Sequence, residues 1–132
     1  MRLKLLMHDP QTWIICSPEY NGSYTYLLKN TIDWASSPVK GDPVWKDGFE
    51  SFTGKVMGVV SALPGALGGL HSQSHLVPLL FNSQCWVTPS SFALGNAGTA
   101  FDKQGGLVNA GRREQAQAVV DQMLFAAKHL AV

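Results

Sequence analysis

The sequence is poor in charge. Only 14% of its 132 residues are Asp, Glu, Lys or Arg, against roughly 25% in an average soluble protein. Ten basic and nine acidic residues leave a net charge of +1. So small an excess provides no basic stripe for nucleic-acid phosphates and no polybasic anchor for a membrane surface. A charge-poor chain of this size also predicts that part of its surface is covered by another subunit.

Long apolar runs and cysteines are scarce as well. The longest apolar runs, around residues 56–63 and 123–127, fall far short of the roughly 20 residues that a membrane-spanning helix needs. Residues 1–10 turn polar too soon for a secretory signal. Cys16 and Cys85 both lie in apolar stretches, which is typical of buried thiols in a reducing compartment. We therefore expect a cytoplasmic protein with a single domain over residues 1–132.

Apolar periodicity predicts that strands and helices alternate along the chain. Short apolar runs predict strands at residues 12–17, 55–62 and 85–88. Helical spacing predicts helices at residues 23–36, 67–81 and 112–130, and Pro78 is expected to kink or end the second one early. Residues 2–7 are expected to be the end of a preceding helix, and residues 90–110 a long loop. This alternation predicts an α/β fold with a parallel sheet.

Two distinctive loops follow the first two predicted strands. Residues 18–23 follow the first strand, and the glycine-rich residues 63–69 follow the second. Parallel sheets bind ligands outside the carboxyl ends of their strands. If the two strands are neighbours, we expect the two loops to lie side by side and to form a binding site.

The same loops carry a family resemblance. The first block is Ser17-Pro18-Glu19-Tyr20-Asn21-Gly22-Ser23, followed by Leu28-Lys29-Asn30-Thr31-Ile32-Asp33-Trp34. The second is Pro64-Gly65-Ala66-Leu67-Gly68-Gly69-Leu70-His71-Ser72-Gln73. Both blocks and their spacing resemble the flavin loops of the NADPH-dependent FMN reductase family, which includes flavodoxin-like quinone, chromate and azo reductases. The resemblance covers about residues 12–90, and His71 stands where the family usually has arginine.

This resemblance implies a flavodoxin-like three-layer sandwich that works as an oxidoreductase with FMN. Electrons would pass from NADPH or NADH through FMN to FMN, a quinone or a similar small acceptor, and the cofactor would supply the chemistry. Tyr20 would lie along the isoalloxazine ring, and backbone N–H groups around Asn21, Gly22, Gly65 and Gly68 would bind its polar edge. The implied cofactor-binding residues are Pro18, Glu19, Tyr20, Asn21, Gly22, Ser23, Ser61, Gly65, Gly68 and Gly69. No catalytic side chain and no metal is expected.

The chain departs from the family pattern at its start. The family's fold begins with a strand and a phosphate-binding loop, and the residues before Thr12 have room for neither. The implied fold is therefore a truncated one, with three parallel strands and flanking helices. The chain could be part of a longer reductase, could complete its sheet with another chain, or could form a rearranged oligomer. We expect it not to be a monomer and to bind FMN weakly without a partner.

Several alternatives stay open. The chain could be a non-catalytic interaction or structural subunit that is derived from the carboxy-terminal half of the reductase fold. Glu19 could touch the ligand or only orient its own loop. His71 and His75 lie on one predicted helix face, a spacing that suits zinc, but no third ligand is indicated. Trp13 and Trp86 are expected in the core.

Overall fold

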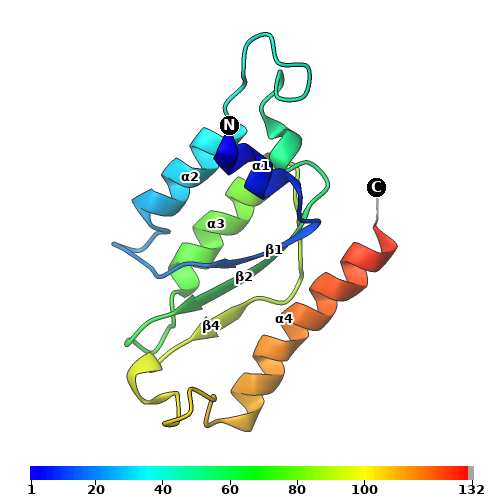
Figure 1. Cartoon of the computed structure of the whole chain (residues 1–132). Coiled ribbons are helices and arrows are strands. Elements are labelled where there is room, and N and C mark those ends of the chain that lie inside the picture. Colours follow the sequence, from blue (N-terminus) through cyan, green and yellow to red (C-terminus); the bar gives the residue numbers. More distant parts are fainter. Residues whose placement is uncertain (131–132) are drawn as a thin grey trace.

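The structure, a computed structural model, describes residues 1–130. Figure 1 shows an open sheet with helices on both faces. The elements in chain order are α1 (Arg2–His8), β1 (Thr12–Cys16), α2 (Tyr26–Ser36), the 3-10 helix η1 (Phe49–Ser51), β2 (Val56–Ala62), α3 (Leu70–Asn82), β3 (Trp86–Val87), β4 (Phe92–Leu94), the 3-10 helix η2 (Ala97–Thr99) and α4 (Ala110–His129). The predicted α/β architecture is confirmed.

Strand β2 lies at the centre of the sheet. β1 pairs with it in parallel over its whole length, from Thr12 opposite Val56 to Cys16 opposite Val60. On its other side β2 pairs in parallel with β3 near its start and with β4 near its end. Within residues 1–130 the sheet therefore has four strands, and our expectation of three was wrong. β3 and β4 follow one another along a single edge.

Pro89 explains why the fourth strand was missed. The chain stays bonded to β2 as far as Thr88, whose N–H donates to the Met57 carbonyl over 2.9 Å. Pro89 has no N–H to donate. The next N–H, of Ser90, donates over 2.8 Å to the Gln122 side chain, and the Gln122 amide donates over 2.8 Å to the Ser90 hydroxyl. The chain thus leaves the ladder and returns as β4, within the segment that was predicted as a loop.

The two faces of the sheet carry different helices. Helices α1, α2 and α3 cover one face, and α4 covers the other (Figure 1). α4 packs Val119 and Met123 against β2 and β4. Gly58 allows this close approach, because a Cβ there would collide with the Met123 sulfur and lie 2.9 Å from Val119 Cγ1.

Local sequence explains where two of the helices begin and end. α2 begins at Tyr26, later than predicted, because Thr25 caps it by accepting the Leu28 N–H over 3.1 Å. α3 spans Leu70–Asn82 and includes Pro78. The helix therefore does not end early at this proline.

Helix α1 is tied to the end of α2 by a buried lysine. Lys4 Nζ donates to the Ala35 carbonyl over 2.7 Å and also to the Ser37 carbonyl, and it lies 5.8 Å from the ring centroid of Trp45. A cation at a helix carboxyl end is favourable because it meets the unpaired carbonyl groups there. Burial lowers the pKa of Lys4. α1 therefore belongs to the folded body, as the prediction of a helix at residues 2–7 implied.

The two edges of the sheet are both partly uncovered. Trp86 of β3 is 54% exposed, so its predicted place in the core is wrong, whereas Trp13 of β1 packs half-buried against the core. Among the described residues β1 pairs only with β2, and its Ile14 is 46% exposed. A hollow of about 390 Å³ runs beside β1 and is lined by Trp13, Ile14 and apolar residues of α1 and α2. The edge formed by β1 is therefore apolar and open.

No helix within residues 1–130 combines the length and the apolar character needed to cross a bilayer.

Candidate functional site

A tight turn forms the tip of the loop after β1. Tyr20 and Ser23 bond each other through both backbone pairs, over 2.8 and 3.1 Å. Between them Asn21 has φ 51° and Gly22 has φ 76°. Positive φ at both central residues is the pattern of a type I′ turn, which Asn-Gly favours. We call residues 20–23 the Tyr20 turn; its tyrosine is 55% exposed.

The loop after β2 is built by packed glycines. Gly68 has φ 63°, and a Cβ there would lie 2.5 Å from the backbone of Leu94 and Gly95. Gly69 has φ 92°, and a Cβ there would lie 2.7 Å from Ser61. Both glycines are therefore required for the loop to lie on β4 and β2. At Gly65, by contrast, an added Cβ would have no atom within 4 Å.

A buried hydrogen-bond network holds the loop after β2 in place. The Ser61 hydroxyl donates to the Gly68 carbonyl over 2.6 Å, and the Gln73 amide donates over 2.7 Å to that hydroxyl. The same Gln73 nitrogen donates over 2.8 Å to the Phe92 carbonyl, while its oxygen is buried without a partner among the described residues. The network joins β2, α3 and β4. Sequence reasoning identified Ser61 but missed Gln73, whose one signal was a polar residue on the buried face of a helix.

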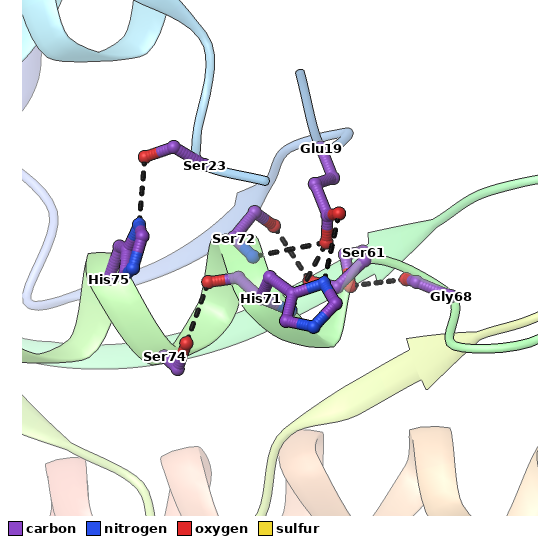
Figure 2. A network of polar contacts seen from close by, with 9 residues as sticks. Glu19, Ser23, Ser61, Gly68, His71, Ser72, Ser74 and His75 are labelled. Carbon is purple, nitrogen blue, oxygen red and sulfur yellow. Dashed lines mark hydrogen bonds and ion pairs between the residues drawn. The ribbon is translucent and has the colours of Figure 1, made fainter. Parts of the chain in front are cut away.

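Glu19 joins the loop after β1 to the first turn of α3, which directly follows the loop after β2, as Figure 2 shows. Its carboxylate accepts the backbone N–H groups of His71 and Ser72 over 3.1 and 3.2 Å, and it lies 3.2 Å from His71 Nδ1. Partial burial acts to raise the pKa of Glu19, but the bonds from His71 and Ser72 and the nearby imidazole outweigh it, so the pKa is lowered. Because β1 and β2 are parallel neighbours, the two loops leave the same edge of the sheet, as expected.

A second contact holds the far end of the Tyr20 turn. His75 Nδ1 lies 3.1 Å from the Ser23 hydroxyl (Figure 2). Both histidines are thus directed at the loop after β1. Within residues 1–130 no three metal-ligating side chains come together.

The rim has features that fit a flat ligand with a polar edge. No atom lies within 4 Å of where a Cβ would stand at Gly22 or Gly65, so a ring can approach the main chain there. Among the described residues, the N–H groups of Asn21 and Gly22 donate no hydrogen bond within the chain. Tyr20 adds an exposed aromatic face. These groups suit the isoalloxazine system of FMN.

Two hollows flank the rim. One of about 380 Å³ lies between the end of β1, the Tyr20 turn and α2, and one of about 350 Å³ lies over the ends of β1, β2 and β4. Both are lined by Ser17 and Pro18. Pro18 therefore separates two spaces that are open to a ligand.

The structure sorts the predicted site residues into two groups. Those at the exposed rim are Pro18, Tyr20, Asn21, Gly22 and Gly65, and those that support the rim from within are Glu19, Ser23, Ser61, Gly68 and Gly69. The Gly68 N–H donates to the Gly65 carbonyl over 3.3 Å. Gly68 therefore shapes the loop, and its N–H is engaged within it.

Comparison with known proteins defines the class. The sequence profile described as NADPH-dependent FMN reductase matches residues 2–99. The chain belongs to this family. Over 114 residues it is 33% identical to an NAD(P)H-dependent FMN reductase of Pseudomonas aeruginosa, a match that covers 86% of this chain and 55% of the relative. Over 129 residues it is 35% identical to a quinone reductase of Pseudomonas putida, covering 86% of this chain and 63% of the relative.

A solved structure shows the same fold. FerB, a flavoenzyme NAD(P)H:(acceptor) oxidoreductase from Paracoccus denitrificans, superposes with a TM-score of 0.73 at 26% identity. The match covers 92% of this chain and 65% of FerB. The fold is therefore flavodoxin-like, as the resemblance implied. The chain spans little more than half the length of the reductases that it matches.

Proposed function

We propose that this chain forms the flavin-binding portion of an NAD(P)H-dependent FMN or quinone reductase. The observation that carries the proposal is the Glu19 link, which joins the loop after β1 over 3.1–3.2 Å to the first turn of α3, directly after the loop that follows β2. Family membership and the names of the relatives support the same reading. Bound FMN would take electrons from NAD(P)H and pass them to a small acceptor such as a quinone.

The residues of the rim have distinct roles in this proposal. Tyr20 contacts one face of the ring, and the N–H groups of Asn21 and Gly22 donate to its polar edge. Gly65 lets the main chain approach from the other loop. The supporting residues Ser61, Gly68 and Gly69 keep that loop in place.

A titration with FMN tests the proposal. Adding the chain to FMN should quench the flavin fluorescence and shift the visible bands, and NADPH added without oxygen should then bleach them. Binding without bleaching would leave a flavin carrier. No binding at any concentration would favour the second candidate function, an interaction or structural subunit, which the open apolar edge along β1 supports.

We propose further that the edge along β1 is covered in the working protein, either by another copy of this chain or by another chain. An open strand of apolar residues is a template for pairing. Ile14 of this strand is 46% exposed and lines the apolar hollow beside it. Both cysteines are free, which is compatible with the reducing interior of a cell.

The two cysteines provide a direct test of this coverage. Cys16, at the end of β1, is exposed, whereas Cys85 is buried and burial raises the pKa of its thiol to about 12. A maleimide should therefore label Cys16 alone in the folded chain. Labelling that slows as the chain is concentrated would indicate self-association. Labelling that slows only with an added partner chain would indicate a mixed complex, and constant labelling of a monomer in light scattering would refute coverage.

A further inference from the structure

The Tyr20 turn has little to hold it except two contacts with α3. Its own backbone bonds are the two between Tyr20 and Ser23, and its tyrosine is exposed rather than packed. A hairpin as short as this is not stable alone in water. Its position must therefore come from the residues that join it to the rest of the molecule.

Those contacts grip the loop at two points. Glu19 precedes the turn and bonds α3 at His71 and Ser72, and Ser23 ends the turn and lies 3.1 Å from His75. His71 and His75 are one helical turn apart, so both face the loop from the same side of α3 (Figure 2). The turn is thus attached to α3 at each end. We call these contacts of Glu19 and Ser23 with α3 the mount.

The amino end of α3 needs this carboxylate. The helix starts after Gly69, which has no side chain to cap the first free N–H groups. Glu19 supplies that cap from a different loop, and its negative charge is favoured at a helix amino end. Helix and turn therefore stabilise each other through a single side chain.

We propose that Glu19, His71 and His75 are positioning residues that hold the Tyr20 turn on α3. They set the distance between this turn and the loop after β2 that FMN requires. This inference rests on the proposed function. None of the three need touch the cofactor. Because the Glu19 carboxylate already occupies the start of α3, a phosphate group of the ligand must be bound elsewhere.

The charged groups around the mount are few. Glu19 comes from the loop itself, and His71 and His75 come from α3. On the adjoining α2, Lys29 and Asp33 pair with each other over 2.7 Å. The mount should therefore respond to pH through Glu19. It should hold best where Glu19 is ionised, because the carboxylate then accepts the N–H groups of His71 and Ser72.

Amide hydrogen exchange of the chain without FMN tests the mount. In Glu19→Ala the N–H groups of His71 and Ser72 lose their acceptor, which a role limited to capping α3 would also predict. The proposal predicts in addition that the N–H groups of Tyr20 and Ser23 exchange about tenfold faster. His75→Ala should speed Tyr20 and Ser23 while leaving His71 and Ser72 unchanged. The exposed Glu50→Gln, on η1, is the matched control.

Binding of FMN gives the second readout. Glu19→Ala should raise the Kd for FMN about tenfold, and Glu19→Gln should raise it less. The native chain is expected to bind FMN more weakly at acid pH as Glu19 is protonated, and Glu19→Gln should abolish this dependence. Far-UV circular dichroism checks that each variant is folded, and Glu19→Gln serves if Glu19→Ala is not. Unchanged exchange at Tyr20 and Ser23 in both Glu19 variants would overturn the inference. Failure of the native chain to bind FMN would instead overturn the proposed function, while the exchange data would still report on the mount.

Discussion

The two loops of the site are held in place by different means. The loop after β2 is fixed by its own backbone, because Gly68 and Gly69 pack where no side chain fits and Ser61 bonds the Gly68 carbonyl from below. The Tyr20 turn is fixed by side chains that reach across to α3. The loop after β2 is therefore part of the fold, and changes there should cost stability. The Tyr20 turn is an attachment, and changes within residues 20–23 should cost ligand binding more than stability.

The largest expected effect is a loss of stability caused by a substitution in the loop after β2. Gly68→Ala should lower the free energy of unfolding by about 3 kcal/mol, because the new Cβ adds left-handed strain to a clash with backbone. That Cβ would lie 2.5 Å from Leu94 and Gly95. Urea unfolding measures the loss. Gly65→Ala, where the Cβ meets open space, is the control and should stay within about 0.5 kcal/mol of the native chain.

The substitution Gln73→Ala should have the second largest effect on stability. It removes the donor that serves both the Ser61 hydroxyl and the Phe92 carbonyl, leaving buried groups unpaired at a cost of about 2 kcal/mol. The midpoint of thermal unfolding should fall accordingly. If stability were unchanged while FMN binding was lost, the network would belong to the ligand site and the contrast between the loops would be weaker.

Tyr20→Ala should separate binding from stability. The side chain is exposed, so the free energy of unfolding should change by less than about 0.5 kcal/mol. The Kd for FMN should rise about tenfold through the lost aromatic contact. Fluorescence titration measures the Kd. Phe125→Ala, which removes an exposed ring from α4, should leave the Kd as it was, and equal effects of the two variants would contradict the placement of FMN on this turn.

The smallest effect should appear in the acid stability of the chain. The pKa of Glu19 is lowered in the folded state, so the unfolded chain binds its proton first as the pH falls. This stabilisation is present above the ordinary pKa of 4.5 and is lost as the pH falls through the folded value. Unfolding midpoints measured from roughly pH 6 to pH 3 should fall more steeply for the native chain than for Glu19→Gln. Parallel curves would show that the link does not depend on charge.

The local pattern of apolar residues was enough to predict most of the helices and strands. The apolar runs around Ile15 and Val59 predicted strands, and the loops that follow them were expected to lie at one edge of the sheet if those strands were neighbours. β4 was missed because its three residues have no periodicity of their own and are a strand only because β2 offers a free edge beyond Pro89. Trp86 was misplaced because edge position is a property of the whole sheet.

The contacts that hold the Tyr20 turn on α3 were harder to predict from the sequence than the strands. Glu19 and His71 are far apart in the chain, and only the fold brings the carboxylate to the helix start. The helix was predicted to begin at residue 67, so the sequence did not reveal that it begins after Gly69, where no side chain of its own caps the first N–H groups. The role of Glu19 as an orienting residue was one of the two alternatives left open, and the contacts favour it.

The interruption at Pro89 has a consequence for assembly. A sheet with two continuous edges can add copies of itself without limit and grow into a filament. Within residues 1–130 one edge is broken between β3 and β4, where the Gln122 side chain accepts the N–H of Ser90, whereas the β1 edge is continuous. If a second copy pairs along β1, growth along the sheet would therefore stop after that single addition, because the other edge of each copy is interrupted.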